Sequence, residues 1–117
     1  MPKFIASMSW DCSSDTPKQA RQLLRAELVG RRWKDRCKDR PMPQNTLWSQ
    51  RTSQGEQTCD DIHTACADDL SAAAAAVRKM GLPCRVVRAF IQVMGGGTYG
   101  LARQEQLAPA AVADDSP

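Results

Sequence analysis

Residues 62–94 read IHTACADDLSAAAAAVRKMGLPCRVVRAFIQVM, a helix pattern followed at once by a strand pattern. From Ile62 to Met80 the apolar residues recur every three or four positions, which is the spacing of one buried helix face. Gly81 and Pro83 end this helix, and over 85–94 the period changes to two. The residues expected to face the helices are Val87, Ala89, Ile91 and Val93. The opposite face carries Val86, Arg88, Phe90 and Gln92. The sequence therefore predicts a helix over about 60–80 and a strand over 85–94.

The N-terminal part repeats the same order of elements. Residues 4–10 alternate between apolar and small side chains, which predicts a strand with one face on a core. Thr16, Pro17 and Gln19 form the pattern of a capping box with proline at the first helical position. We expect a helix over about 17–29, ended by Gly30.

Two further strands are predicted between the helices. Residues 31–40 are polar but contain Trp33, which predicts a short edge strand that covers part of the core and ends before Pro41. Residues 45–51 have the composition of a strand. The order strand, helix, strand, strand, helix, strand predicts a ferredoxin-like α+β plait, with a four-stranded antiparallel sheet and both helices on one face. The uncovered sheet face would carry Ile5, Ser7, Ser9, Val86, Arg88, Phe90 and Gln92, and a second copy of the chain is expected on it.

The length and composition indicate one domain. The chain has 117 residues, of which 42% are hydrophobic and 5% aromatic, so we expect one domain over 1–102 and a flexible tail over 103–117. No apolar run approaches the roughly 20 residues that cross a bilayer, and the N-terminus lacks the pattern of a secretion signal. Five irregularly spaced cysteines without a C-x-x-C pair predict reduced thiols and a cytoplasmic location.

Positive charge is concentrated in the first half of the chain. Residues 1–51 carry 11 Lys and Arg against 5 Asp and Glu, whereas residues 52–117 carry 5 against 8. The candidate contacts to nucleic acid or another acidic partner are Arg31, Arg32, Lys34, Arg36, Lys38, Arg40 and Arg51. This pattern is typical of a surface that follows phosphates, and equally of a solvated strand edge protected from aggregation. Trp10, Trp33, Trp48 and Tyr99 would either stack on bases or pack in the core.

Other patterns offer weaker candidate sites. Gly95, Gly97 and Gly100 match a dinucleotide-binding spacing, but too little chain follows for the required helix, so a flexible turn is expected. Cys59, His63 and Cys66 share a helix face. They would form a metal site, provide a Cys–His nucleophile, or serve only as ordinary helix residues. We expect no cofactor.

Asp11 ends the first strand, where its carboxylate would bind a divalent metal, act as a base or only shape the turn. The segment Phe4-Ile5-Ala6-Ser7-Met8-Ser9-Trp10-Asp11, followed by the helix at Thr16-Pro17, resembles a group of small ferredoxin-like proteins. The group comprises the CRISPR adaptation nucleases, the virulence-associated protein D toxins and the GhoS-type antitoxins. The resemblance implies a cytoplasmic homodimer that cleaves RNA, binds nucleic acid or acts in defence against mobile elements, and it implies a metal-binding role for Asp11 alone.

Together these patterns predict a small dimeric binding protein of a bacterial or phage conflict system, such as defence, counter-defence or a toxin–antitoxin pair. It would contact nucleic acid, or an enzyme that acts on nucleic acid, through the basic residues. One alternative is a metal-dependent endoribonuclease with Asp11 at a dimer interface. Another is an inhibitor or assembly subunit that binds only protein.

Overall fold

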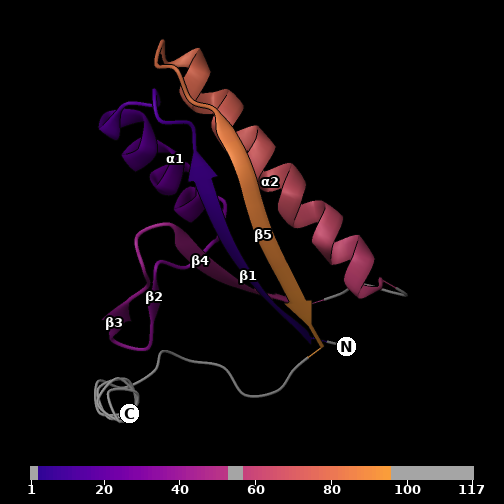
Figure 1. Ribbon diagram of the computed structural model, residues 1–117. Helices are drawn as coiled ribbons and strands as arrows, with labels where there is room; N and C mark the ends of the chain where they lie inside the picture. The colour runs from indigo at the N-terminus through magenta and orange to yellow at the C-terminus, as the bar shows by residue number, and fades with distance from the viewer. Residues whose placement is uncertain (1–2, 53–56, 96–117) are drawn as a thin grey trace, which may run out of the picture.

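The computed structural model describes residues 3–52 and 57–95, and within them the chain forms two helices and five strands (Figure 1). In chain order these are β1 (Lys3–Cys12), α1 (Lys18–Gly30), β2 (Arg36–Cys37), β3 (Arg40–Pro41), β4 (Thr46–Thr52), α2 (Cys59–Lys79) and β5 (Val86–Met94). The mixed α/β composition agrees with the sequence prediction. Because helices and strands each bury one face, the arrangement follows from how these faces meet.

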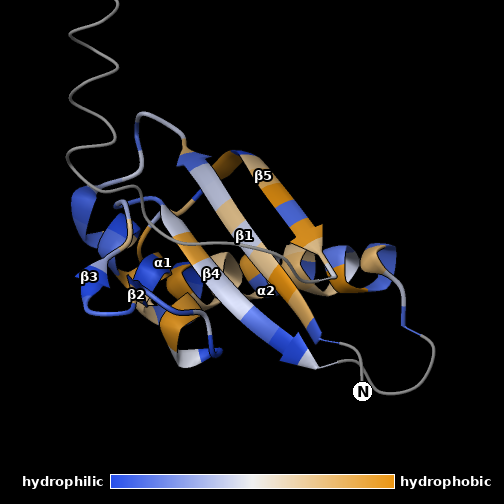
Figure 2. Cartoon of the chain, turned by 90° about the horizontal axis from the view of Figure 1, so that it is seen from below, coloured by the Kyte–Doolittle hydropathy of each residue, from blue (hydrophilic) through white to orange (hydrophobic). Residues whose placement is uncertain are grey.

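The main sheet has β1 at its centre. β1 pairs antiparallel with β4 on one side and with β5 on the other, so that Met8 lies between Leu47 and Ile91. α1 and α2 cover the same face of this sheet (Figure 2). Every second residue of β1 points to the helices and is buried with Leu24 of α1 and Val77 of α2. These residues are Phe4, Ala6, Met8 and Trp10.

The expected fourth strand is reduced to a single bridge. Lys34 pairs with Trp48 at the outer edge of β4, and the chain then leaves the edge to form the small two-stranded sheet β2–β3. Trp33 is only 1% exposed, as predicted for a residue that covers the core. The segment departs because it offers the main core little besides Trp33: its other residues are charged, apart from Cys37, which is buried at the base of the small sheet.

The two helices begin differently from the sequence prediction. The capping box expected at Thr16 is wrong, since Pro17 occupies the N-cap of α1 and no side chain caps it. The Thr16 hydroxyl lies 2.8 Å from that of Ser13, and this hydroxyl–hydroxyl contact holds it in the preceding turn. A capping box forms instead at α2, where Thr58 and Asp61 bond reciprocally to each other's backbone N–H.

The face assignment in β5 is corrected at its first residues. The ladder with β1 shifts register between Asp11 and Cys12, and this irregularity turns Val86 toward the core. Val87, expected inside, is 49% exposed, and Ala89 is also exposed because β5 is an edge strand. Ile91 and Val93 pack against the core as predicted.

Candidate nucleic-acid interface

The basic segment, residues 31–40, presents its cations to solvent. The exposed residues are Arg31, Arg32, Lys34, Arg36, Lys38 and Arg40. The last three lie on the β2–β3 hairpin, whose strands are joined by a tight turn at Lys38 and Asp39 (Figure 1). Lys38 has a φ of 57°, a left-handed conformation that closes this turn without glycine.

The backbone of the hairpin is fixed from several sides. The indole nitrogen of Trp48 donates to the carbonyl of Arg36 at 2.8 Å, and the N–H of Met42 donates to the carbonyl of Asp35 at 2.8 Å. Arg25 of α1 donates to the carbonyl of Pro43 at 3.1 Å. Cys37 of β2 is itself buried. The cations of the hairpin are therefore held on an ordered backbone rather than on a free loop.

The electrostatic balance of this segment is strongly positive. Six cations stand against the carboxylates of Asp35 and Asp39, a net charge of +4 in ten residues. Lys34 lies over the Trp48 ring, with its Nζ 4.7 Å from the ring centroid. Figure 2 shows the hydrophilic character of β2 and β3, in contrast to the largely hydrophobic β5.

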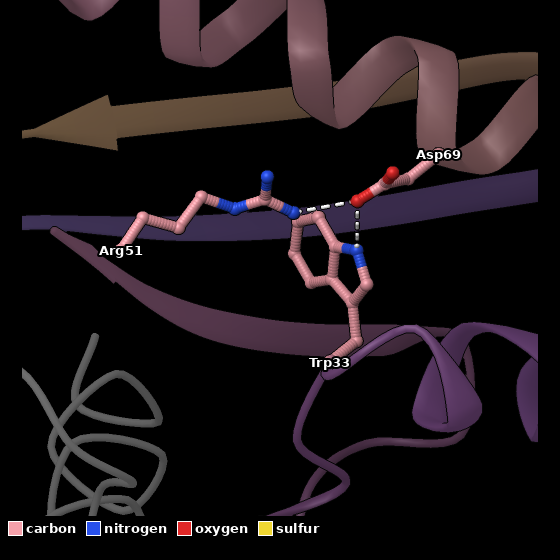
Figure 3. A network of polar contacts seen from close by, with 3 residues as sticks. All are labelled: Trp33, Arg51 and Asp69. Atoms are coloured by element: carbon pink, nitrogen blue, oxygen red, sulfur yellow. Dashed lines mark hydrogen bonds and ion pairs between the residues drawn. The ribbon is translucent and has the colours of Figure 1, made fainter. Parts of the chain in front are cut away.

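Arg51 differs from the other predicted contacts because it is part of a polar network inside the fold (Figure 3). Its Nη2 lies 2.6 Å from Oδ2 of Asp69, and the same oxygen accepts a hydrogen bond of 3.0 Å from the indole nitrogen of Trp33. The Arg51 guanidinium also lies 5.2 Å from the Trp33 ring centroid. The network joins β4, α2 and the start of the basic segment, and sequence spacing gave no sign of it.

The tryptophans divide between the two roles weighed for them. Trp10 and Trp33 are buried in the core and unavailable for stacking on a base. Trp48 is partly exposed beside the hairpin and is covered by Lys34. Tyr99 lies outside the described residues. Among the tryptophans, only Trp48 is therefore partly accessible to a base.

Asp11 lies on the uncovered face of the sheet, far from the hairpin in sequence. Its Oδ2 accepts a hydrogen bond of 2.7 Å from Nε of Arg88, which is opposite it in β5. Its carboxylate, predicted as a metal ligand or base, is thus already engaged by a guanidinium.

Cys59, His63 and Cys66 do not gather into a metal site. Cys66 is buried in the core, whereas Cys59 and His63 are exposed on α2. Burial raises the pKa of the Cys66 thiol, which disfavours the thiolate that a nucleophile or metal ligand requires. Across residues 3–52 and 57–95, no three His, Cys, Asp or Glu residues are placed to hold a metal ion.

The remaining expectations concern the C-terminal part and the membrane. The glycine turn beyond Gly95 and the tail over 103–117 lie outside the described residues. Neither α1 nor α2 combines the length and the apolar character that a membrane-spanning helix needs, and no other helix is found in the described part of the chain. Comparisons with protein-family models, curated proteins and solved structures find no match.

Proposed function

We propose that this protein binds nucleic acid through the basic segment. The observation that carries the proposal is the set of six exposed cations, net charge +4, on a backbone anchored by Trp48 and Arg25. A nucleic-acid backbone releases condensed counterions when Lys and Arg neutralise its phosphates, and this release drives binding without sequence-specific contacts. An anchored hairpin loses less conformational entropy on binding than a free loop would.

Binding is proposed in preference to RNA cleavage because of the surroundings of Asp11. The Asp11–Arg88 ion pair is exposed and weak, but within residues 3–52 and 57–95 no group of three His, Cys, Asp or Glu side chains forms around Asp11 to hold a metal ion. An acidic protein surface would also complement the basic segment, so a partner protein is an outcome that the experiment below must separate.

The wider setting of the proposal comes from the fold and the resemblance. We propose a reduced ferredoxin-like plait, supported by the strand order β4-β1-β5 and by the Lys34–Trp48 bridge where the fourth strand would lie. A role in a conflict system is supported only by the resemblance at residues 4–11. All five cysteines are free thiols, which fits the reducing cytoplasm.

We also propose a homodimer. The described helices cover one sheet face only, and on the other face Phe90 is 67% exposed, although Ile5, expected to be uncovered there, is only 8% exposed. β5 is an edge strand with mostly apolar residues, a kind of edge that readily pairs with another chain. A second copy would cover both features.

The salt dependence of binding tests the nucleic-acid proposal. If about four phosphates of a single strand are neutralised, the logarithm of the affinity should fall with a slope of about −3 against the logarithm of salt concentration. Fluorescence anisotropy with a labelled single strand should then show a loss of about 200-fold between about 50 and about 300 mM salt. A pull-down from a cell lysate, with and without nuclease treatment, separates the two kinds of partner. A protein that is retained after nuclease treatment would indicate a protein partner rather than nucleic acid.

A matched pair of variants locates the contact. Lys38→Gln removes a charge from the hairpin and should make the salt slope for a single strand shallower by about 0.7. Lys79→Gln removes the same charge from the exposed end of α2 and should leave the slope unchanged. Equal affinity at both salt concentrations, or equal effects of both variants, would contradict the proposal.

A further inference from the structure

The outer edge of β4 is left open where the fourth strand is missing. Lys34 and Trp48 exchange both backbone hydrogen bonds, at 2.7 and 3.2 Å. A continued ladder would set Arg32 opposite Gln50, but Arg32 has a φ of 75° and turns the chain away. In an antiparallel strand, the backbone N–H and C=O of every second residue point to the same edge. Because those of Trp48 bond to Lys34, the N–H of Gln50 also points to this open edge. No backbone partner is recorded for it in the described part of the chain.

A cavity of about 540 Å³ occupies this position. It is lined by the end of β4, by the first half of α2, and by Arg31 and Arg32 after α1. The described lining residues with side-chain donors are Arg31, Arg32, Ser49, Gln50, Arg51, Thr52 and Gln57. The cavity exists because the chain departs from the sheet edge after a single bridge.

One lining side chain has a donor that is not satisfied. Arg51 binds Asp69 through Nη2, but its buried Nε has no hydrogen-bond partner. No described carboxylate forms an ion pair with Arg31 or Arg32. A buried donor without an acceptor is costly, which favours a ligand that supplies acceptor oxygens to Nε of Arg51 and to these two guanidinium groups.

The charge of the cavity selects the class of ligand. Three guanidinium groups stand against one carboxylate among the described lining residues, that of Asp69, so the balance is +2. A phosphate monoester carries between about −1.5 and −2 at neutral pH, whereas an internal phosphodiester carries one charge. Guanidinium groups and backbone N–H groups both match the geometry of phosphate oxygens.

We propose that this cavity binds the terminal phosphate of a nucleic-acid strand. The inference rests on the proposed function, because the rest of the strand would follow the basic segment that begins at Arg31. Arg31 and Arg32 belong both to the cavity and to that segment, so they connect a strand end to the phosphates that follow it. The protein would then distinguish strands by their ends rather than by their sequence.

The experiment compares strands that differ at one end. A strand with a 5′-phosphate and one with a 3′-phosphate are each measured against unphosphorylated strands one and two nucleotides longer, whose total charges bracket that of the phosphorylated strand. We expect one phosphorylated end to bind at least about tenfold more tightly. Arg32→Asn should abolish this preference, and asparagine tolerates the positive φ at this position. Lys38→Gln should weaken all strands and preserve the preference.

The outcomes separate this inference from the proposed function. Equal affinity for phosphorylated and unphosphorylated strands, or a preference that survives Arg32→Asn, overturns the inference and leaves the proposed function standing. If no strand binds at low salt, the proposed function fails. Calorimetry with inorganic phosphate then tests separately whether the cavity binds phosphate. Phosphate binding that is lost in Arg32→Asn would support the cavity, and no phosphate binding would overturn it.

Discussion

Trp33 shows how a single residue joins distant parts of this chain. It follows α1, is almost wholly buried, and donates its indole N–H to Asp69 of α2, while Arg51 of β4 binds the same carboxylate. The sequence predicted that Trp33 would cover the core, because a tryptophan in a charged segment needs burial. It did not predict Asp69 or Arg51, because partners 36 and 18 residues apart leave no periodic signal.

Removing the shared acceptor should destabilise the protein. Asp69→Ala leaves the buried indole N–H without its partner and the partly buried guanidinium without its counter-ion. We expect the free energy of unfolding in urea to fall by about 1–3 kcal/mol. Asp69→Asn keeps an acceptor oxygen and should lose less.

The neighbouring aspartate provides the control for this prediction. Asp68 is exposed on the same helix, and Asp68→Ala should change the free energy of unfolding by no more than about 0.5 kcal/mol. Equal losses in Asp68→Ala and Asp69→Ala would show that the network contributes nothing beyond the loss of a negative charge.

At the scale of elements, the helices were more predictable than the strands between them. Both helices carry long apolar periodicities, and their observed bounds lie within a few residues of the expected ones. The segment after α1 has no such pattern, and its course depends on one bridge and on hydrogen bonds from Trp48 and Arg25. The cations of the candidate interface could therefore be found from the sequence, whereas their hairpin and the cavity beside it could not.

Replacing the glycine at the end of each helix by alanine should change the stability of the protein in opposite directions. Gly30 is the last residue of α1 and lacks a positive φ, whereas Gly81 follows α2 with a φ of 89°. A Cβ atom would meet nothing within 4 Å at either position, so only the backbone conformation differs. Gly30→Ala should raise the free energy of unfolding by about 0.5–1 kcal/mol, and Gly81→Ala should lower it by about 1 kcal/mol. Urea unfolding of both variants measures this, and shifts of the same sign would contradict it.

At the scale of the whole molecule, the sheet face without helices is exposed mainly at its β5 side, where Phe90 lies, whereas Ile5 of β1 is buried. The alternation in β1 predicted which residues would face the helices, and those from Phe4 to Trp10 do so. In β5 the prediction failed at Val86 and Val87, because a register shift in the ladder with β1 cannot be seen in one strand alone. The result is an apolar edge strand, and the uncovered face beside it carries Phe90.

This exposed surface yields a prediction about oligomeric state. Phe90 is 67% exposed, so Phe90→Lys should leave the stability of a single chain within about 0.5 kcal/mol of the parent. If a second copy covers the uncovered face and the β5 edge, the added lysines would be buried at the interface, and the dimer should dissociate. Light scattering after size exclusion should report a dimer for the parent and a monomer for Phe90→Lys. Gln22→Lys adds the same charge on an exposed position of α1 and should remain dimeric.

The ratio of ultraviolet absorbance by nucleic acid to that by protein, measured in the same run, shows whether nucleic acid co-purifies. Nuclease treatment then separates a dimer held by protein contacts from one held by a shared strand. A parent that is monomeric after this treatment, or a dimer that persists in Phe90→Lys, would show that this surface does not hold a second copy.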